Sequence, residues 1–178
     1  VEPFLIKRLS EGADAKTVAK TYGRLQSFFQ DAQTIGSPIV GALRDKSGAR
    51  YCSVIVFLAS ALSYAILASS TTLSHLFYSK LAATLQAGFL VAQAGVAAAT
   101  ATAPPAVRAA ALGRLTTAYT IGATVGPTVG GYLGTTGDLY RGARLAVGVS
   151  LLSALLSLRV PKGTWVRKDS DKTGSGVW

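Results

Sequence analysis

Charged residues are scarce in this chain of 178 residues, because Asp, Glu, Lys and Arg together make up 15% of it. Soluble domains usually carry about 25% charged residues, so the composition excludes an ordinary soluble enzyme. The sequence has one cysteine, Cys52, and one histidine, His75. A lone cysteine closes no intramolecular disulfide, and a lone histidine forms no cluster with metal-ligand spacing. We therefore predict no enzyme activity, no metal site and no cofactor.

Methionine is absent from the sequence, which begins at Val1. The chain therefore lacks its own initiator, and we expect it to be a fragment of a longer product. A signal peptide would show a basic segment, an apolar segment and a small-residue cleavage site in that order. Residues 1–20 do not follow this order, so we interpret the first segment as structural.

Acidic residues are fewer than basic ones, with eight Asp and Glu against eighteen Lys and Arg, for a net charge of +10. A nucleic-acid-binding protein clusters its basic residues beside aromatic ones. Here the basic residues separate apolar runs instead, so we predict no nucleic-acid partner and assign the positive charge to loops.

Long apolar runs dominate the rest of the sequence. A bilayer core about 30 Å thick requires about 20 predominantly apolar residues per helix. Three runs of this kind carry no charge, one contains only Asp31, and a shorter one is extended by Arg141 and Arg144, whose long side chains can reach the membrane surface. The runs are Tyr51–Ser74, Leu81–Val107, Leu115–Gly137, Leu25–Leu43 and Leu145–Leu158. We predict an all-α polytopic membrane helix bundle with spanning helices near Thr21–Leu43, Tyr51–Ser70, Leu73–Ala99, Ala109–Gly134 and Tyr140–Leu158.

Three regions follow from this pattern. Residues 1–20 are expected to contain the end of an earlier helix, at Val1–Ile6, and an external loop; residues 21–159 form the five-helix bundle. Residues 160–178 are rich in Lys, Asp, Ser, Gly and Thr and are expected to be a disordered cytoplasmic linker. Ten basic residues fall on the side of the linker and six on the other side. Because cytoplasmic loops carry the excess of Lys and Arg, we place the ten-charge side in the cytoplasm.

The first predicted spanning helix has a polar half. At about 100° per residue this half holds Arg24, Gln26, Ser27, Gln30, Asp31, Gln33, Thr34 and Ser37. Unpaired polar groups at bilayer depth cost several kcal/mol each, so this half cannot face lipid. It is expected either to line a cavity or to form hydrogen bonds between helices. The next helix, Tyr51–Ser74, is apolar on all sides and is expected to face lipid.

The loop between these helices, residues 41–50, combines glycines with charges. Its defining residues are Gly41, Asp45, Lys46, Gly48 and Arg50. Asp45 lies at the negative end of its helix dipole, so we expect a partner such as Arg50 or a nearby backbone donor. By composition this is only a charged loop. As a pattern, G-x-L-x-D-[RK]-x-G-x-[RK], it resembles the cytoplasmic loop signature of the major facilitator superfamily at every specified position.

A second pattern lies in the run Leu115–Gly137, in the form G-x-x-x-G-P-x-x-G-G. Its residues are Gly122, Gly126, Pro127, Gly130 and Gly131. A stripe of small residues every four positions permits close helix crossing in lipid, and a proline is expected to kink the helix. Generic helix packing is one interpretation. The pattern also resembles the fifth-helix motif of antiporters in the superfamily, and this resemblance implies exchange.

Lys80 is a charge expected within the membrane and therefore a candidate functional residue. With Leu76 it is similar to the first half of a fourth-helix pattern of these antiporters, L-x-x-x-R-x-x-x-G, although Lys replaces Arg and Thr84 replaces Gly. The alternative is a lysine that extends to the membrane surface. We expect Asp31 and Lys80 to face one cavity and to exchange partners with a proton and a cationic substrate; the alternative is that Asp31 bonds Ser27 or a glutamine.

The resemblance implies half of a major facilitator fold that lacks most of its first helix. It is strongest toward tetracycline-efflux and organic-cation-transporter-like carriers. It implies a secondary active transporter that works by alternating access and exports small amphipathic or cationic molecules against protons. The implied partners are the lipid bilayer, a small-molecule substrate, a coupling ion and the missing C-terminal half. The alternative is a truncated membrane protein that does not transport and acts as an assembly partner or an inactive fragment.

Overall fold

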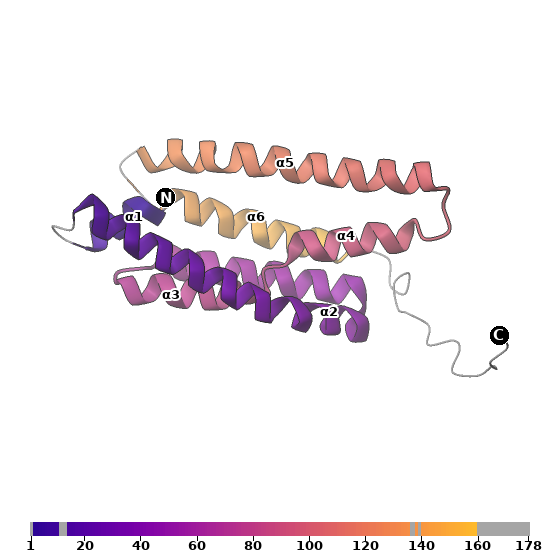
Figure 1. The fold of residues 1–178 in the computed structure, drawn as a ribbon, viewed down its shortest axis with the longest axis horizontal. Coiled ribbons are helices and arrows are strands. Elements are labelled where there is room, and N and C mark those ends of the chain that lie inside the picture. Colours follow the sequence, from indigo (N-terminus) through magenta and orange to yellow (C-terminus); the bar gives the residue numbers. More distant parts are fainter. Residues whose placement is uncertain (1, 11–13, 136–137, 139, 160–178) are drawn as a thin grey trace.

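A computed structural model describes residues 2–10, 14–135, 138 and 140–159 of the chain. Within these residues every regular element is helical (Figure 1). The predicted linker at 160–178 lies outside the described residues, as does the loop at 11–13. The long elements run antiparallel to one another, as short connections between consecutive helices require (Figure 1).

The first two helices are α1, Glu2–Leu9, and α2, Ala15–Ala68. Helix α2 thus begins before the predicted start at Thr21. Its N-cap is Asp14, whose Oδ1 accepts a hydrogen bond from the backbone N–H of Thr17 at 3.0 Å. Hydrogen bonding by the side chain and then by the backbone of Thr17 stabilises the ionised carboxylate and holds the pKa of Asp14 below its usual value of 3.8.

Helix α2 is a helical hairpin of two arms that meet at Gly48. Gly48 has φ 78° and ψ 165°, which lies in a region of backbone space almost restricted to glycine. The arms fold back on each other beside this bend, since the Cys52 thiol donates to the carbonyl of Val40 at 3.6 Å. Residues twelve apart on a straight helix would lie about 18 Å apart along its axis. The turn therefore lies within residues 41–50, where the sequence predicted a loop between two helices.

The third predicted helix is broken. Helix α3 spans Leu73–Ala82, a 3₁₀ turn η1 spans Ala83–Leu85, and α4 spans Gly88–Ala99. The expectation of one uninterrupted helix over Leu73–Ala99 is wrong, although this stretch is apolar enough to count as one span. Hydropathy measures the apolar character of the stretch and is insensitive to a local loss of helical hydrogen bonds that neighbouring helices can replace.

The remaining helices are α5, Pro105–Thr135, and α6, Arg141–Ser157. Helix α5 continues through Pro127 and has α4 and α6 as its main neighbours, whereas α6 packs along α2. In Figure 1, α5 lies along one edge of the bundle. Most of its side chains are exposed in the described part of the chain.

Two clusters of buried apolar residues hold the helices together. One surrounds α1 and contains Leu5, Ile6, Leu25, Leu67, Leu76 and Ala143. The other lies nearer the α2 bend and contains Val40, Cys52, Val56 and Val91. Helix α1 is thus anchored by its two fully buried residues, Leu5 and Ile6.

The second arm of α2 packs into both clusters on one side and exposes Tyr51, Ile55, Leu58 and Leu62 on the other, so the expectation that Tyr51–Ser74 faces lipid fits one face of the helix only. Cys52, Val56, Ser60 and Ser63 are buried in this arm. Small side chains let neighbouring helices approach closely in a membrane protein. Because lipid and a protein interior are similarly apolar, overall hydropathy does not separate a lipid-facing helix from a packed one. In the sequence, the small residues Ser60 and Ser63 were the feature that could have indicated a packed face on this arm.

Candidate functional site

A cavity of about 930 Å³ lies among α2, α3, η1, α4, α5 and α6. Among the described residues, its wall combines amide, hydroxyl and aromatic side chains with a single charged one. The polar members are Gln26, Gln30, Gln33, Ser37, Ser60, Ser63, Tyr64, Ser79, Lys80, Gln86, Tyr119, Ser150 and Ser153. A polar space inside an apolar bundle is the arrangement that a membrane protein uses to hold a polar ligand or water.

The glutamines of α2 reach this cavity because they recur on one stripe of the helix. At about 100° per residue, Gln30 and Gln33 lie within about 40° of Gln26. The side chain of Gln33 donates to the backbone carbonyl of Gln86 at 3.2 Å, and Gln86 in turn donates to the Tyr64 hydroxyl at 3.3 Å. The polar face therefore lines a cavity, as the sequence allowed, and it also donates a hydrogen bond to the break between α3 and α4.

The break between α3 and α4 forms one side of the cavity. Gly36 of α2 approaches η1 so closely that a Cβ at this position would lie 2.1 Å from the carbonyl oxygen of Thr84. The carbonyl of Gln86, just past η1, accepts the hydrogen bond from Gln33. A backbone group outside the helical hydrogen-bond pattern thus finds a side-chain partner, as burial at membrane depth requires.

Lys80 extends into the cavity from α3. Its Nζ lies 4.7 Å from the centre of the Phe29 ring, a cation–π contact with α2. The neighbouring residue Ser79 is fixed to the second arm of α2, since the Ser63 hydroxyl donates to the Ser79 carbonyl at 2.8 Å. The structure therefore brings Lys80 together with the glutamine stripe and does not turn it toward the membrane surface.

Asp31 is not part of the cavity wall, so the expectation that it shares this cavity with Lys80 is wrong. Its side chain is exposed and makes no hydrogen bond or ion pair in the described part of the chain, neither with Ser27 nor with a glutamine. The reason is angular, because five residues separate Asp31 from Gln26 and turn its side chain about 140° away. The polar residues thus extend over too wide an angle around the helix for all of them to face one cavity.

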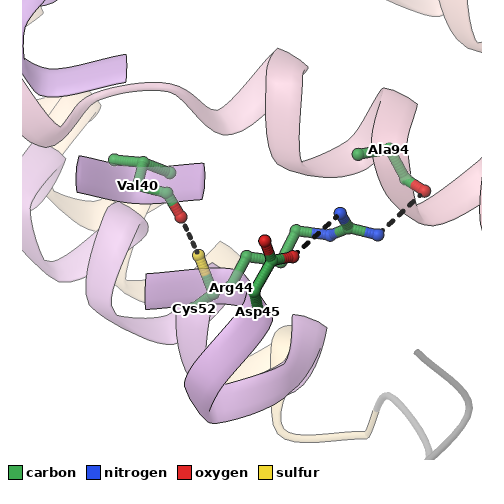
Figure 2. A network of polar contacts seen from close by, with 5 residues as sticks. All are labelled: Val40, Arg44, Asp45, Cys52 and Ala94. Atoms are coloured by element: carbon green, nitrogen blue, oxygen red, sulfur yellow. Dashed lines mark hydrogen bonds and ion pairs between the residues drawn. The ribbon is translucent and has the colours of Figure 1, made fainter. Parts of the chain in front are cut away.

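The charged loop motif occupies the bend of α2 (Figure 2). For Asp45 we expected a partner such as Arg50 or a nearby backbone donor; its carboxylate instead lies 3.9 Å from Arg44 Nη1, and no Asp45–Arg50 pair occurs in the described residues. Asp45 is 66% exposed, whereas Arg44 is 20% exposed and also donates to the carbonyl of Ala94 in α4 at 3.2 Å (Figure 2). Arg44 therefore connects the bend to α4.

Other motif residues take different positions around this bend. Lys46 is exposed, Gly41 and Arg50 are half-buried, and Gly48 makes the turn. The Nε atoms of Arg44 and Arg50 are buried without a hydrogen bond in the described part of the chain. Sequence reasoning missed Arg44 because the pattern leaves its position unspecified, although it directly precedes Asp45.

The glycine motif of α5 makes no close helix crossing within the described residues. A Cβ added at Gly122, Gly126 or Gly131 would meet no atom within 4 Å. Pro127 is exposed on the same helix and Gly130 is half-buried. The part of α5 that does reach the cavity is Tyr119, whose ring centre lies 4.5 Å from that of Phe89. The sequence did not predict this contact, because the motif in α5 is defined by its glycines and does not include Tyr119.

These features define a class of protein, a multi-pass membrane protein whose apolar helices enclose a polar cavity. Two stretches, Ala15–Ala68 and Leu73–Ala99, are long and apolar enough to cross a membrane. The Major Facilitator Superfamily model matches residues 16–176 of the chain. The chain therefore belongs to this superfamily of membrane transporters, which is not an enzyme family.

Individual relatives agree with this assignment. Solute carrier family 22 member 18 of Mus musculus is 35% identical over 160 residues, which cover 87% of this chain and 37% of the mouse protein. Solute carrier family 67 member A1 of Homo sapiens is 32% identical over 170 residues, or 92% of this chain and 38% of the human protein. The class H tetracycline resistance protein of Pasteurella multocida is 32% identical over 136 residues, or 75% and 33%. The chain thus spans 33–38% of the length of these relatives, and no solved structure matches it.

Proposed function

We propose that the chain forms part of a secondary active transporter that exports small amphipathic or cationic molecules in exchange for protons. The observation that carries this proposal is the polar cavity inside an apolar bundle, with Gln26, Gln30 and Gln33 on one wall. In alternating access, a substrate bound in such a cavity is exposed first to one side of the membrane and then to the other. The tetracycline resistance proteins among its relatives support a drug-like substrate.

The cavity suits a molecule with both a flat apolar part and polar groups. Aromatic side chains from different elements offer ring faces; they are Phe29, Phe57, Tyr64, Phe89 and Tyr119. Amide and hydroxyl groups between the rings can accept or donate hydrogen bonds. The described wall contains no acidic residue, so a cationic group would bind to ring faces and amide oxygens.

The position of Lys80 gives this proposal a specific consequence. Its ammonium already occupies one such ring face, that of Phe29. A cationic substrate would compete with Lys80 for this ring and would also be repelled by its charge. Replacing Lys80 with glutamine should therefore tighten the binding of a cation by about fivefold, because a cation–π contact is worth about 1 kcal/mol. Lys80→Arg keeps the charge and should leave the affinity close to that of the wild type.

The first experiment measures binding to the chain in lipid nanodiscs, with radiolabelled tetraphenylphosphonium as a cationic amphipathic probe. Gln30→Leu should weaken binding, because Gln30 lines the cavity. The matched control is Gln93→Leu, an exposed position of α4 outside the cavity wall, which should bind like the wild type. Equal affinities for the two glutamine variants would contradict the cavity as the binding site.

The second experiment tests transport, using vesicles that contain the complete transporter. An imposed pH gradient should drive accumulation of the same probe, and a protonophore should abolish it. Binding without gradient-driven movement would contradict proton-coupled export and would favour the alternative, a membrane protein that does not transport.

A further inference from the structure

Asp31 presents an exposed carboxylate near the middle of the first arm of α2. It lies sixteen residues after Ala15 and seventeen before Gly48, about 24 Å and about 26 Å from the two ends at 1.5 Å per residue. A helix arm of this length places its centre close to the middle of a hydrocarbon core about 30 Å thick. Asp31 therefore lies at a depth where lipid provides no hydrogen-bond donor.

Large apolar side chains lie on one side of Asp31 on this face, and the small, exposed hydroxyl side chains of Ser27 and Thr34 lie on the other. Phe28 is 38% exposed, Ile35 67% and Ile39 53%. The opposite side of the same arm is buried, since Gly36 packs against Thr84 and Val40 lies in an apolar cluster. Phe28 also meets Phe77 of α3, with 5.6 Å between the two ring centres, so α3 borders this face. The face around Asp31 is thus exposed, with one acid between an apolar side and a side that carries hydroxyl groups.

No cation of the described chain is placed to neutralise Asp31. Lys80 lies over Phe29 on the cavity side of the arm. Arg24 is seven residues away, about 10.5 Å along the helix axis, and no ion pair joins it to Asp31. An unpaired carboxylate in hydrocarbon costs several kcal/mol, whether charged or neutral, because even the neutral acid needs a hydrogen-bond partner.

We propose that this face, Phe28, Asp31, Ile35 and Ile39, is an interface covered by a transmembrane helix that carries an arginine or lysine at mid-membrane depth. Charge complementarity selects this partner, since a basic group opposite Asp31 satisfies the carboxylate and the isoleucines pack against the apolar rest of the partner helix. Asp31 is then a docking residue and not a member of the transport cavity. The inference depends only on membrane residence and stands apart from the proposed substrate.

The experiment offers the chain three synthetic transmembrane helices in lipid vesicles. They share one apolar sequence and differ only in the central residue, which is lysine, leucine or glutamate. Energy transfer between a donor on the chain and an acceptor on the peptide reports association. The lysine peptide should bind about tenfold more tightly than the leucine peptide, in line with polar contacts between membrane helices, and the glutamate peptide should bind no better than the leucine peptide.

The variant Asp31→Asn should remove the preference for the lysine peptide, because asparagine keeps the size of the side chain and loses its charge. Asp45→Asn is the matched control, since Asp45 is an exposed acid at the bend of the same helix and its loss should leave the preference intact. Unchanged circular dichroism shows that both variants fold. A preference that survives Asp31→Asn, or equal binding of the three peptides, would overturn the proposal. Association between copies of the chain that Asp31→Asn abolishes would also overturn it, because the occupant would then be a second copy.

Discussion

Replacing Gly36 with alanine should separate the first arm of α2 from η1 and destabilise the cavity wall. The added Cβ would lie 2.1 Å from the carbonyl oxygen of Thr84 and 2.8 Å from its methyl group. Atoms of this kind do not approach within 3.0 Å, so the two backbones must separate by about 0.9 Å. Such overpacking costs about 1–3 kcal/mol. It also stretches the hydrogen bond from Gln33 to the Gln86 carbonyl, which is 3.2 Å long before the change.

Gly23→Ala separates this steric cost from the helix propensity of alanine. Nothing lies within 4 Å of a Cβ at Gly23, so this variant should gain about 0.5–1 kcal/mol from its lower backbone entropy in the unfolded chain. The assay is unfolding in mixed micelles with increasing sodium dodecyl sulfate, followed by circular dichroism. The free energies of unfolding of the two variants should differ by about 1–3 kcal/mol. Equal free energies would refute the close contact between Gly36 and Thr84.

Three further changes test other contacts. Gly48→Ala should lower the free energy of unfolding by about 1–3 kcal/mol, because φ 78° with ψ 165° is strained for alanine; a loss below about 0.5 kcal/mol in the micelle assay would contradict the bend. Arg44→Ala should cost about 1.5–3 kcal/mol through its bond to the Ala94 carbonyl, and more than Arg50→Ala in the same assay. Asp14→Ala should speed amide hydrogen exchange at Thr17. Because the folded pKa of Asp14 is lowered, its cap acts above the usual value of 3.8 and is lost as the pH falls through the folded pKa, so wild type and variant should exchange alike only in acid.

The sequence predicts the helical segments well because each depends on one local quantity, a long run without charge. It also predicts the loop at residues 41–50, within which Gly48 makes the bend because glycine permits a backbone conformation that other residues rarely adopt. It fails at the end of α3, because helical hydrogen bonds there are replaced by a contact with Gln33, which is 53 residues from Gln86 in the sequence. A contact between residues so far apart in the sequence leaves no pattern in either local stretch of sequence.

The residues of the candidate site also divide into those that the local sequence predicts and those that it does not. The glutamine stripe could be predicted from helical periodicity, and the same arithmetic applied more narrowly would have placed Asp31 about 140° away from it. Lys80 could be identified as an unusual charge, but its position over Phe29 depends on how α3 packs against α2. Arg44 contacts Ala94 across 50 residues, so only the structure distinguishes it from the other basic residues of the loop.

Because Gln33 donates a hydrogen bond to the Gln86 carbonyl, it is less free to vary than other residues of the cavity wall. Substitution of Gln33 would leave a backbone carbonyl unsatisfied at membrane depth, so any change in ligand preference at that position would come with a loss of stability. The Gln30 side chain lines the same cavity and makes no hydrogen bond in the described part of the chain. New selectivity should therefore evolve more readily at Gln30 than at Gln33, one helical turn away on the same stripe.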